Sequence, residues 1–583
     1  SMRNITSTKA VRPLTTLPNP YILWQNSLEY MDNVSWHKGK HALKFGIDFI
    51  HHRNDVGGSG AAGGIKFSID GYQTVAAVGA KRPNNLTGTA DGLLGLANQL
   101  TTYYVFDKTR MRDNRLSAFV QDEWRATKKL SLSLGLRYEW FPTFTVVGDR
   151  QTNFDFATGK VLVPQEARGW VQQFLGFPDG NLPPGYQYLP GNQVLGKNIG
   201  VDLSPRIGFA YSITPWLVLR GGYGIFHTVP AALDVNNTVG APFSFQVQLT
   251  GDTATPIVVA NGFPSSNIYE TLNSNAIPPA QFQGRYYDPY VQKYGMNLQV
   301  MPLRKTAIEV GYEGNHAIRL DVSTRLNYPT PAPGDINARR PYPQWGEGFG
   351  IEFTGYSHFN AFEMTVRQQL THGFTVYSQL TLQHSYGAVA YVDPYNWNYG
   401  RGTLAIDTAH QWASSVIYDA PSLRQQPWML RQPFGGWQIA AIYQLRGGLP
   451  FSVNSSQAMN DDIDASRANL TLANGPAALP TGQRSINRWF NTNAFTTPAD
   501  YTWGNSGFNI LRGPGWSELA LAVQKSFSIT ESKKLTFRAE AQNALNRVNL
   551  GQPSATLGAA ALGTIRSLNG DPRLMQMVLK FAF

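Results

Sequence analysis

The sequence predicts an all-β fold: a transmembrane antiparallel β-barrel of the outer-membrane type, with short periplasmic turns and long extracellular loops. Apolar residues alternate with polar or small ones over segments of about ten residues, the length of a membrane-spanning strand. No run of about 18 or more apolar residues occurs, so a helical membrane span is excluded. Short and long connections between the alternating segments follow one another along the chain.

The composition suits strands and turns better than helices. Charged residues make up 15% of the 583 residues, against about 25% in ordinary soluble domains. The formal net charge is +11, but Lys and Arg are scattered singly and form no basic stripe, so nucleic acid is not an expected partner. The chain has no Cys, which excludes disulfides, cysteine nucleophiles, zinc knuckles and iron–sulfur ligation.

The clearest alternation lies in the segments 130–139, 437–445 and 535–542. Successive side chains of a strand point to opposite faces, so each segment is predicted to be a strand with one apolar and one polar face. Comparable strands are predicted at 42–52, 115–125, 206–213, 217–227, 306–313, 361–370, 374–383, 411–419, 517–527 and 574–583. A soluble sandwich would alternate in the same way, but its strands average about five or six residues, so the greater length favours a membrane barrel.

The connections give the barrel a direction. Short turns are predicted at 126–129, 214–215, 302–305, 372–373 and 530–534. Long, loosely structured loops are predicted at about 142–204, 228–285, 326–350, 385–409 and 453–515. Since outer-membrane barrels have short periplasmic turns and long extracellular loops, the last strand runs inward and the C-terminus lies on the periplasmic side.

Aromatic residues recur at the ends of the predicted strands, where a membrane barrel carries its interfacial girdles. These residues are Trp124, Tyr138, Trp140, Trp216, Trp437 and Phe527. The final strand places several large apolar side chains on one face and ends on an aromatic residue, which resembles the C-terminal signal read by the barrel-assembly machinery. Its members are Met575, Met577, Leu579, Phe581 and Phe583. A buried edge strand of a soluble protein is the alternative interpretation.

Several sequence segments point to a known protein family: SWHKGKHALKFGIDF, RLSAFVQDEWRATKKLSLSLGLRYEWF, SPRIGFAYSITPWLVLRGGYGIFH and GWQIAAIYQLRGGLPFSV. Together with the run from Leu511 to the terminal Phe583, they resemble the barrel of TonB-dependent receptors, specifically the large Oar-like branch. The resemblance implies a 22-stranded barrel with an N-terminal plug, energised by TonB. The alternation indicates roughly 14 to 20 strands. The residues before Tyr21 supply neither plug nor TonB box.

The N-terminus begins SMRNITSTKAV, without the apolar region of an export signal, so we expect further sequence upstream. Residues 1–20 are predicted to be an N-terminal extension, and residues 21–583 the receptor-type barrel.

Motifs that could carry chemistry are weak. The sequence at 58–63 spells GxGxxG, but another strand pattern follows it where a dinucleotide site needs a helix, so a flexible loop is favoured. His37 and His41 flank a predicted hairpin turn, which is favoured over a metal pair. The acidic residues Asp461, Asp462 and Asp464 could bind calcium, although a solvated loop is favoured. Because the sequence has no GxSxG, P-loop or HExxH motif, neither an enzyme nor a cofactor is expected.

Two aromatic runs in the predicted loops suit the binding of saccharides, peptides or another protein. They contain Tyr286, Tyr287 and Tyr290, and Tyr391, Tyr395, Trp397 and Tyr399. Packing of the loops against the barrel mouth is the alternative. The polar positions Arg137, Glu139, Arg538 and Glu540 are expected to form charge ladders inside the barrel rather than a ligand path.

The resemblance implies an outer-membrane receptor that takes up an oligosaccharide, a peptide or a chelated metal. Its expected partners are membrane lipid, the barrel-assembly machinery and, where a plug exists upstream, the TonB system. A surface structural or adhesion barrel that binds a partner protein, and a passive pore, are the alternatives.

Overall fold

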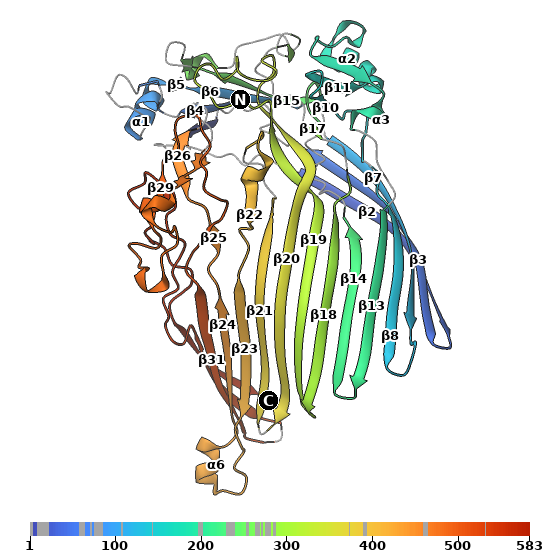
Figure 1. Cartoon of the computed structure of the whole chain (residues 1–583), viewed down its shortest axis with the longest axis vertical. Coiled ribbons are helices and arrows are strands. Elements are labelled where there is room, and N and C mark those ends of the chain that lie inside the picture. Colours follow the sequence, from blue (N-terminus) through green and yellow to red (C-terminus); the bar gives the residue numbers. More distant parts are fainter. Residues whose placement is uncertain are drawn as a thin grey trace.

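Long antiparallel strands dominate the fold (Figure 1). The computed structural model describes residues 4–7, 22–57, 65–69, 71, 73–74, 85–105, 109–142, 144–195, 202–228, 239–251, 256–262, 269, 272–273, 282–283, 287–371, 373–388, 393–458, 465–530 and 532–583. Within these ranges no helix has both the length and the apolar character needed to cross a membrane.

One sheet of 18 strands forms the body of the protein. Fifteen of them are long and form an unbroken antiparallel series. In spatial order these are β2 (Ile22–Lys38), β3 (His41–Gly57), β7 (Thr109–Trp124), β8 (Leu130–Trp140), β13 (Asp202–Thr214), β14 (Leu217–His227), β18 (Tyr290–Leu303), β19 (Thr306–Leu326), β20 (Gly348–Thr371), β21 (Phe374–Ala388), β23 (His410–Asp419), β24 (Trp437–Arg446), β31 (Trp516–Ser528), β32 (Lys534–Gln542) and β34 (Leu574–Ala582). The short strands β9 (Thr145–Val146), β17 (Phe282–Gln283) and β22 (Arg401–Thr403) extend the sheet at one end. The predicted all-β, antiparallel fold is confirmed.

Every predicted strand overlaps a strand of this sheet, and most observed strands are longer; β20 has 24 residues. Two of the fifteen long strands, β2 and β18, fall outside the predicted ranges. In β2, Asn26 and Asp32 alternate in phase with Trp24 and Trp36, so they interrupt the apolar pattern on that face.

The connections divide the sheet into two ends. At one end, which we call the turn end, most strands are joined by tight turns; the β2–β3 turn has Gly39 at φ 61°. One turn-end connection is longer and carries the helix α6 (Trp428–Phe434), which hangs below the sheet in Figure 1. At the other end, the loop end, lie all five predicted long loops and two that were not predicted, at 58–108 and 543–573.

The two faces of the sheet differ in polarity. On β13 and β14 the paired residues Ile207 and Tyr223 are 57% and 40% exposed on one face, which we call the apolar face. The alternate positions Arg206 and Arg220 lie on the opposite, polar face. In a membrane barrel the apolar face contacts lipid and the polar face lines the lumen.

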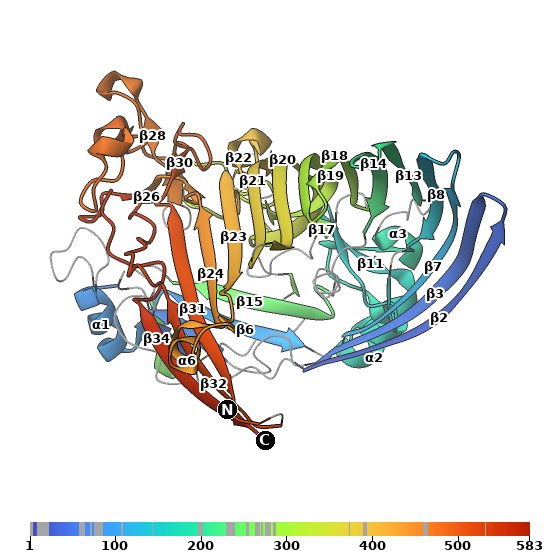
Figure 2. The ribbon, with the colours of Figure 1, turned by 90° about the horizontal axis from the view of Figure 1, so that it is seen from below.

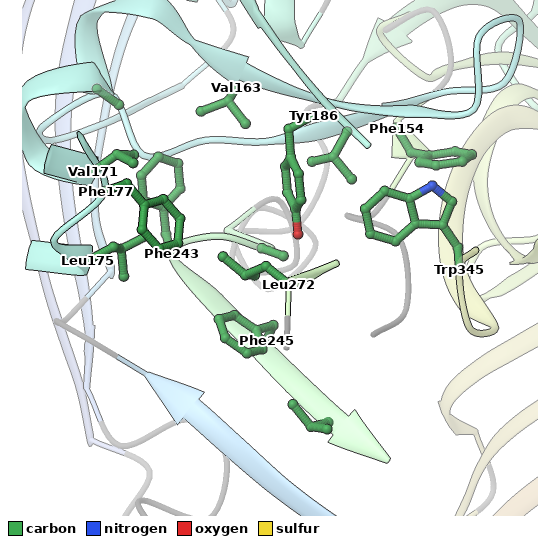
Figure 3. Close-up of a cluster of buried hydrophobic side chains, with 14 residues drawn as sticks. Phe154, Val163, Val171, Leu175, Phe177, Tyr186, Phe243, Phe245, Leu272 and Trp345 are labelled. Carbon is green, nitrogen blue, oxygen red and sulfur yellow. The ribbon is translucent and has the colours of Figure 1, made fainter. Parts of the chain in front are cut away.

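The long loops are packed rather than loose. The strands β10 (Asn153–Asp155), β11 (Lys160–Pro164), β12 (Tyr186–Leu189) and β15 (Ser244–Thr250), with the helix α2 (Arg168–Leu175), surround a buried apolar cluster (Figure 3). Trp345, from the loop between β19 and β20, contributes to it and is 2% exposed. We call residues 144–195, 239–251 and 327–347 the loop cap. The expectation of loosely structured loops is wrong here, because residues from three loops that are far apart in sequence share one core.

Two further structures lie among the loops. β1 (Asn4–Ser7), β4 (Ile65–Ile69), β6 (Gln99–Val105) and β15 form a small sheet near the helix α1 (Asn85–Leu94) (Figure 1). The connection between β24 and β31 has its own core, with Val453, Phe490 and Leu511 each at most 3% exposed. Its short strands are β25 (Pro450–Phe451), β26 (Asn454–Ala458), β27 (Ala465–Arg467), β28 (Asn469–Leu470), β29 (Phe495–Thr496) and β30 (Leu511–Arg512).

The curved sheet is open between its two edge strands, β2 and β34 (Figure 2). No pairing joins these two strands among the described residues. Since each neighbour in the series of fifteen is antiparallel, β2 and β34 run in the same direction. Both present backbone groups that a further strand could pair with.

Candidate functional site

A hollow of about 620 Å³ lies against the sheet where β13, β14, β18, β19, β20 and β21 run side by side. Its floor is made by glycines that the strand register brings into line. Gly208 pairs with Gly222, and Gly222 pairs with Gly295, so three neighbouring strands carry no side chain at this level of the polar face. Gly224 and Gly311 extend the bare area to the adjacent levels.

The close strand packing leaves little room for larger residues at these positions. A Cβ atom on Gly222 would lie 3.0 Å from the carbonyl oxygen of Ile207, and one on Gly295 would lie 3.3 Å from that of Tyr312. Glycine therefore keeps both the strand spacing and the depth of the hollow.

Four cationic side chains border the hollow: Arg206 on β13, Arg220 on β14 and Lys293 on β18 at one side, and Arg367 on β20 at the other. The Arg206 guanidinium carbon lies 4.5 Å from the centre of the Phe226 ring, and the Lys293 Nζ lies 5.7 Å from the same centre. These contacts hold Arg206 and Lys293 without neutralising them.

Three carboxylates border the other side: Glu309 and Glu313 on β19, and Glu363 on β20. In the register Glu363 faces Gly311, which lies midway along β19 between the two other glutamates. Among the described residues, neither these three carboxylates nor the four cations make an ion pair. Unneutralised charges of both signs thus border the hollow, basic on β13, β14 and β18, and mainly acidic on β19 and β20.

Sequence reasoning missed this site. The glycines lie in the segments RIGFAY, RGGYGIF and YGMN, but each segment alone predicts only a strand that contains small residues. Only the pairing of Gly208, Gly222 and Gly295 across three strands turns them into a hollow, and register is not readable from one strand.

The predicted charge ladders are present on the polar face. Arg137 Nε lies 2.9 Å from Glu139 Oε1, and Arg538 forms an ion pair with Glu540 on β32. Both pairs join residues two apart on a single strand, as the alternation requires.

At the loop end the Arg137–Glu139 pair continues into a buried polar cluster. Ser204 Oγ donates a hydrogen bond to Glu139 Oε2 at 2.8 Å and lies 3.0 Å from His227 Nδ1. His227 Nε2 lies 3.5 Å from Asp202 Oδ1.

Asp288, just before β18, completes this cluster and is 6% exposed. Burial, reinforced by a hydrogen bond with Asp202 and by the negative charge of that carboxylate, raises the pKa of Asp288 to about 8. The Asp288 carboxyl is therefore protonated at neutral pH.

The first predicted aromatic run gathers around one cation. The Arg319 guanidinium carbon lies 4.7 Å from the ring centre of Tyr287 and 5.6 Å from that of Tyr290. Tyr290 also lies 5.4 Å from the His227 ring. Tyr286 lies outside the described residues.

The second predicted run is spread over several contacts. Tyr399 is 8% exposed, and the Arg467 guanidinium carbon lies 3.6 Å above its ring. The Tyr395 hydroxyl donates a hydrogen bond to the carbonyl of Tyr328, while Trp397 is half-buried. Tyr391 lies outside the described residues. Tyr395 and Tyr399 thus have separate packing partners.

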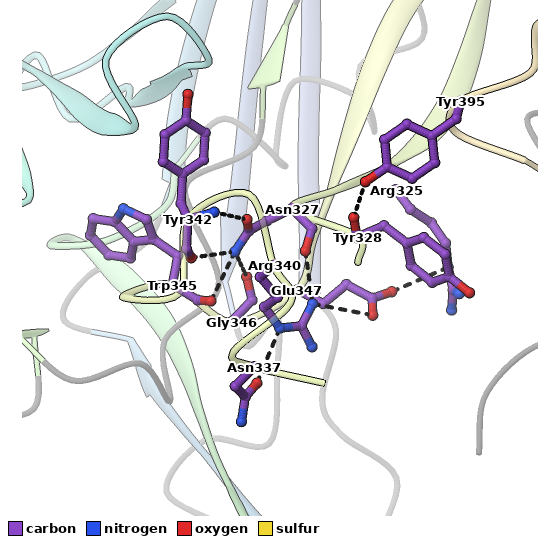
Figure 4. A network of polar contacts seen from close by, with 10 residues as sticks. All are labelled: Arg325, Asn327, Tyr328, Asn337, Arg340, Tyr342, Trp345, Gly346, Glu347 and Tyr395. Carbon is purple, nitrogen blue, oxygen red and sulfur yellow. Dashed lines mark hydrogen bonds and ion pairs between the residues drawn. The ribbon is translucent and has the colours of Figure 1, made fainter. Parts of the chain in front are cut away.

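A polar network fixes the loop that carries Trp345 (Figure 4). The Asn327 side-chain amide donates to the carbonyls of Tyr342, Trp345 and Gly346 at 2.9, 2.8 and 3.1 Å. Its side-chain oxygen accepts from the Tyr342 amide at 2.9 Å. Glu347 links Arg325, at 3.2 Å, to Arg340, at 3.7 Å. The loop cap is therefore tied to the ends of β19 and β20.

Of the remaining predicted positions, the two histidines lie at a tight turn, and the others lie outside the described residues. His37 and His41 flank the tight β2–β3 turn, and His41 Nδ1 lies 2.7 Å from Asp122 Oδ2. The GxGxxG glycines and Asp461, Asp462 and Asp464 lie outside the described residues. No group of three or more His, Asp or Glu residues in the described part of the chain is arranged to hold a metal ion.

The predicted assembly signal lies on one face of β34. Met575, Met577, Leu579 and Phe581 pair with Ala541, Ala539, Phe537 and Leu535 of β32. All four are at least 50% exposed, and the terminal Phe583 is 92% exposed.

Solved structures that resemble this chain include three bacterial membrane proteins. The outer membrane transporter YddB from Escherichia coli gives a TM-score of 0.48 at 11% identity, covering 99% of this chain and 57% of the transporter. The ferric-catecholate import receptor Fiu from E. coli K12 gives 0.42 at 10%, covering 96% and 55%. The ferric enterobactin receptor PfeA from Pseudomonas aeruginosa gives 0.45 at 10%, covering 96% and 54%. The chain thus spans a little over half the length of each.

A comparison with curated proteins found no match. The sequence matches the profile of a protein family, described as the outer membrane beta barrel domain, over residues 3–576. The chain therefore belongs to the outer membrane beta barrel domain family, and it is a protein of the bacterial outer membrane.

Proposed function

We propose that the chain is the barrel part of a TonB-dependent receptor of the Oar-like branch, and that it takes up a nutrient such as an oligosaccharide, a peptide or a chelated metal. The observation that carries this proposal is the hollow of about 620 Å³ on the polar face. Its volume suits a small ligand, and unneutralised charges border it. The quoted sequence strings support the branch.

The orientation follows from the connections. The turn end lies in the periplasm and the loop end outside the cell, since outer-membrane barrels have short periplasmic turns. Ligand entering from outside then meets the loop cap before the hollow. Residues 21–583 form the receptor-type barrel, and residues 1–20 form an extension. Its segment Asn4–Ser7 is strand β1, which pairs with β4 in the small sheet among the loops. The barrel-assembly machinery inserts the barrel, and TonB energises uptake through a plug.

Closure of the barrel requires more strands than the described sheet holds. β2 and β34 run in the same direction, so joining them directly would make one parallel pair in an antiparallel barrel. An odd number of additional strands restores antiparallel pairing throughout. We propose that another part of the polypeptide, or a partner chain, supplies these strands.

Uptake by living cells tests the proposed function. Cells that carry the gene should accumulate a labelled nutrient from a mixture of oligosaccharides, peptides and iron chelates, and cells without the gene should not. The uptake should disappear when TonB is deleted or the proton gradient is collapsed. Gene-dependent uptake that continues without TonB would contradict active import and identify a passive pore.

The loop cap supports one alternative, a surface barrel that binds a partner protein. Trp170 and Phe174 stack on α2 with ring centres 5.1 Å apart, and Phe174 is 57% exposed. An exposed aromatic residue on a rigid, packed element suits a protein contact. In this case no nutrient is accumulated, and replacing Phe174 with Ser weakens adhesion of cells to the partner.

A further inference from the structure

We infer that the hollow on the polar face binds a short peptide or a similar zwitterion, with the ligand carboxylate toward Arg220 and the ligand ammonium toward Glu363. This inference rests on the proposed function and names its ligand class. It follows from the charges around the hollow, from the absence of neutralising partners in the described part of the chain, and from the length of the gap between Arg220 and Glu363.

The register places the two key side chains on one line across the strands. Arg220 pairs with Asn297, Asn297 with Gly311, and Gly311 with Glu363. Three strand spacings therefore separate Arg220 from Glu363, which is about 14 Å of backbone. Between them Gly311 has no side chain, so a bound ligand could lie across the strands.

Charges of like sign lie beside each end of this gap, and Arg367, on β20 with Glu363, also borders the hollow. Glu309 and Glu313 flank Glu363, while Arg206 and Lys293 lie on the strands beside Arg220. Like charges repel each other more strongly where the surroundings are less polar than water, unless a counter-charge is supplied. Elsewhere on the same face Arg137 pairs with Glu139. The contrast indicates that the hollow takes its counter-charges from a ligand.

The two signs together select the ligand class. An anion alone would satisfy Arg220 but would meet the three glutamates, and a cation alone would meet the four basic residues. A neutral sugar would leave both groups without a counter-charge. A ligand with one charge of each sign, held apart by a flexible chain, satisfies both sides at once.

The gap fits a short peptide. An extended chain spans at most about 3.3–3.6 Å per residue, so two to four residues, helped by the reach of Arg220 and Glu363, cover about 14 Å. Tyr377 and Phe226 border the hollow and offer apolar surface to the peptide side chains.

Equilibrium binding to the purified, detergent-solubilised protein tests the inference. The probe is trialanine, compared with its N-acetylated form, its C-terminal amide and the form blocked at both ends. We expect trialanine to bind and each single block to weaken binding by about tenfold or more, the loss expected for one charge-assisted hydrogen bond. Equal affinity for free and doubly blocked trialanine, tighter binding of maltotriose than of trialanine, or no binding of trialanine would each overturn the inference.

Two variants assign the ends of the peptide. Arg220→Gln should weaken trialanine binding about tenfold while the C-terminal amide binds the variant and the wild type equally, because the amide lacks the carboxylate that Arg220 holds. Glu363→Gln should behave in the same way toward N-acetyl-trialanine. Equal losses for free and blocked peptides in either variant would show a general structural defect and overturn the assignment.

Arg538→Gln and Glu540→Gln are matched controls. They make the same chemical changes on the same face, at a pair of residues outside the hollow. Both should bind trialanine like the wild type; a comparable loss of affinity would contradict a site confined to the hollow.

Failure of this inference is distinguishable from failure of the proposed function. TonB-dependent uptake of another nutrient, without trialanine binding, overturns the ligand class and leaves the receptor function standing. If the purified protein binds trialanine in the pattern above but cells that carry the gene show no uptake, the transport function is overturned and the binding site stands.

Discussion

Arg220 and Glu363 lie on one line across four strands of the polar face, with Asn297 and Gly311 between them and no ion pair to either charge among the described residues. Their separation makes the sheet wall a dipolar surface rather than a salt-bridged one. Because the glycines beside them leave about 620 Å³ open, this wall can receive a ligand as well as line a lumen.

Filling the hollow should abolish binding without destroying the fold. In Gly222→Val the new Cβ meets the Ile207 carbonyl oxygen at 3.0 Å, and the methyl groups enter the hollow. We expect at least about a tenfold loss of trialanine affinity and about 1–2 kcal/mol of destabilisation from crowding. Titration calorimetry and denaturant unfolding measure the two effects. Gly208→Ala adds a single methyl group, which meets Ser133 Cβ at an ordinary 3.5 Å, so we expect smaller losses of affinity and stability; losses equal to those of Gly222→Val would contradict the account.

The stability of the loop end should depend on pH through Asp288. Because the pKa of Asp288 is raised to about 8 in the fold, the folded protein binds more protons than the unfolded chain between about pH 4 and pH 8. Stability therefore falls as pH rises through this window, by at most about 1.4 kcal/mol per pH unit for this one group. The Asp288→Asn variant should show a weaker fall in melting temperature between pH 5 and pH 8. An unchanged pH dependence would show that Asp288 does not carry the effect.

Asn327 should control the order of the loop cap. Its side chain makes four hydrogen bonds to the backbone of residues 342–346, and its φ of 54° suits Asn better than Ala. Asn327→Ala should cost about 2 kcal/mol or more locally, because buried carbonyl groups lose their donor. Hydrogen–deuterium exchange of residues 340–347 should then increase. Asn337→Ala, which removes only an exposed contact with Arg340, should leave exchange near the wild-type rate.

Cysteine cross-linking tests the predicted closure of the barrel. The chain has no native Cys, so introduced pairs report without background. Phe537→Cys with Leu579→Cys joins paired positions of β32 and β34 and should form a disulfide in outer membranes. Leu28→Cys with Leu579→Cys should not, because additional strands separate β2 from β34. Efficient cross-linking of that second pair would show that the two edges meet directly.

The sequence predicted the sheet well, because alternation is a local signal. The segment 130–139 and the terminal strand with Met575 and Phe581 could be read as two-faced strands without knowing their neighbours. β2 was missed because Asn26 and Asp32 break the pattern on its apolar face.

Features that depend on register or on distant contacts could not be predicted. The hollow exists because Gly208, Gly222 and Gly295 fall at one level of three strands. The loop cap exists because Trp345 reaches a cluster whose other members, from Phe154 to Leu272, belong to other loops far away in the chain. Aromatic loop residues such as Tyr399 could be identified from the sequence, whereas the contact of Tyr399 with Arg467 could not.

The most direct test of the account is an experimental structure of the protein with trialanine bound. The account predicts density in the hollow, with the peptide carboxylate within hydrogen-bond distance of Arg220 and the ammonium within hydrogen-bond distance of Glu363. Density only among the loop aromatics around Arg319, with the hollow empty, would contradict it.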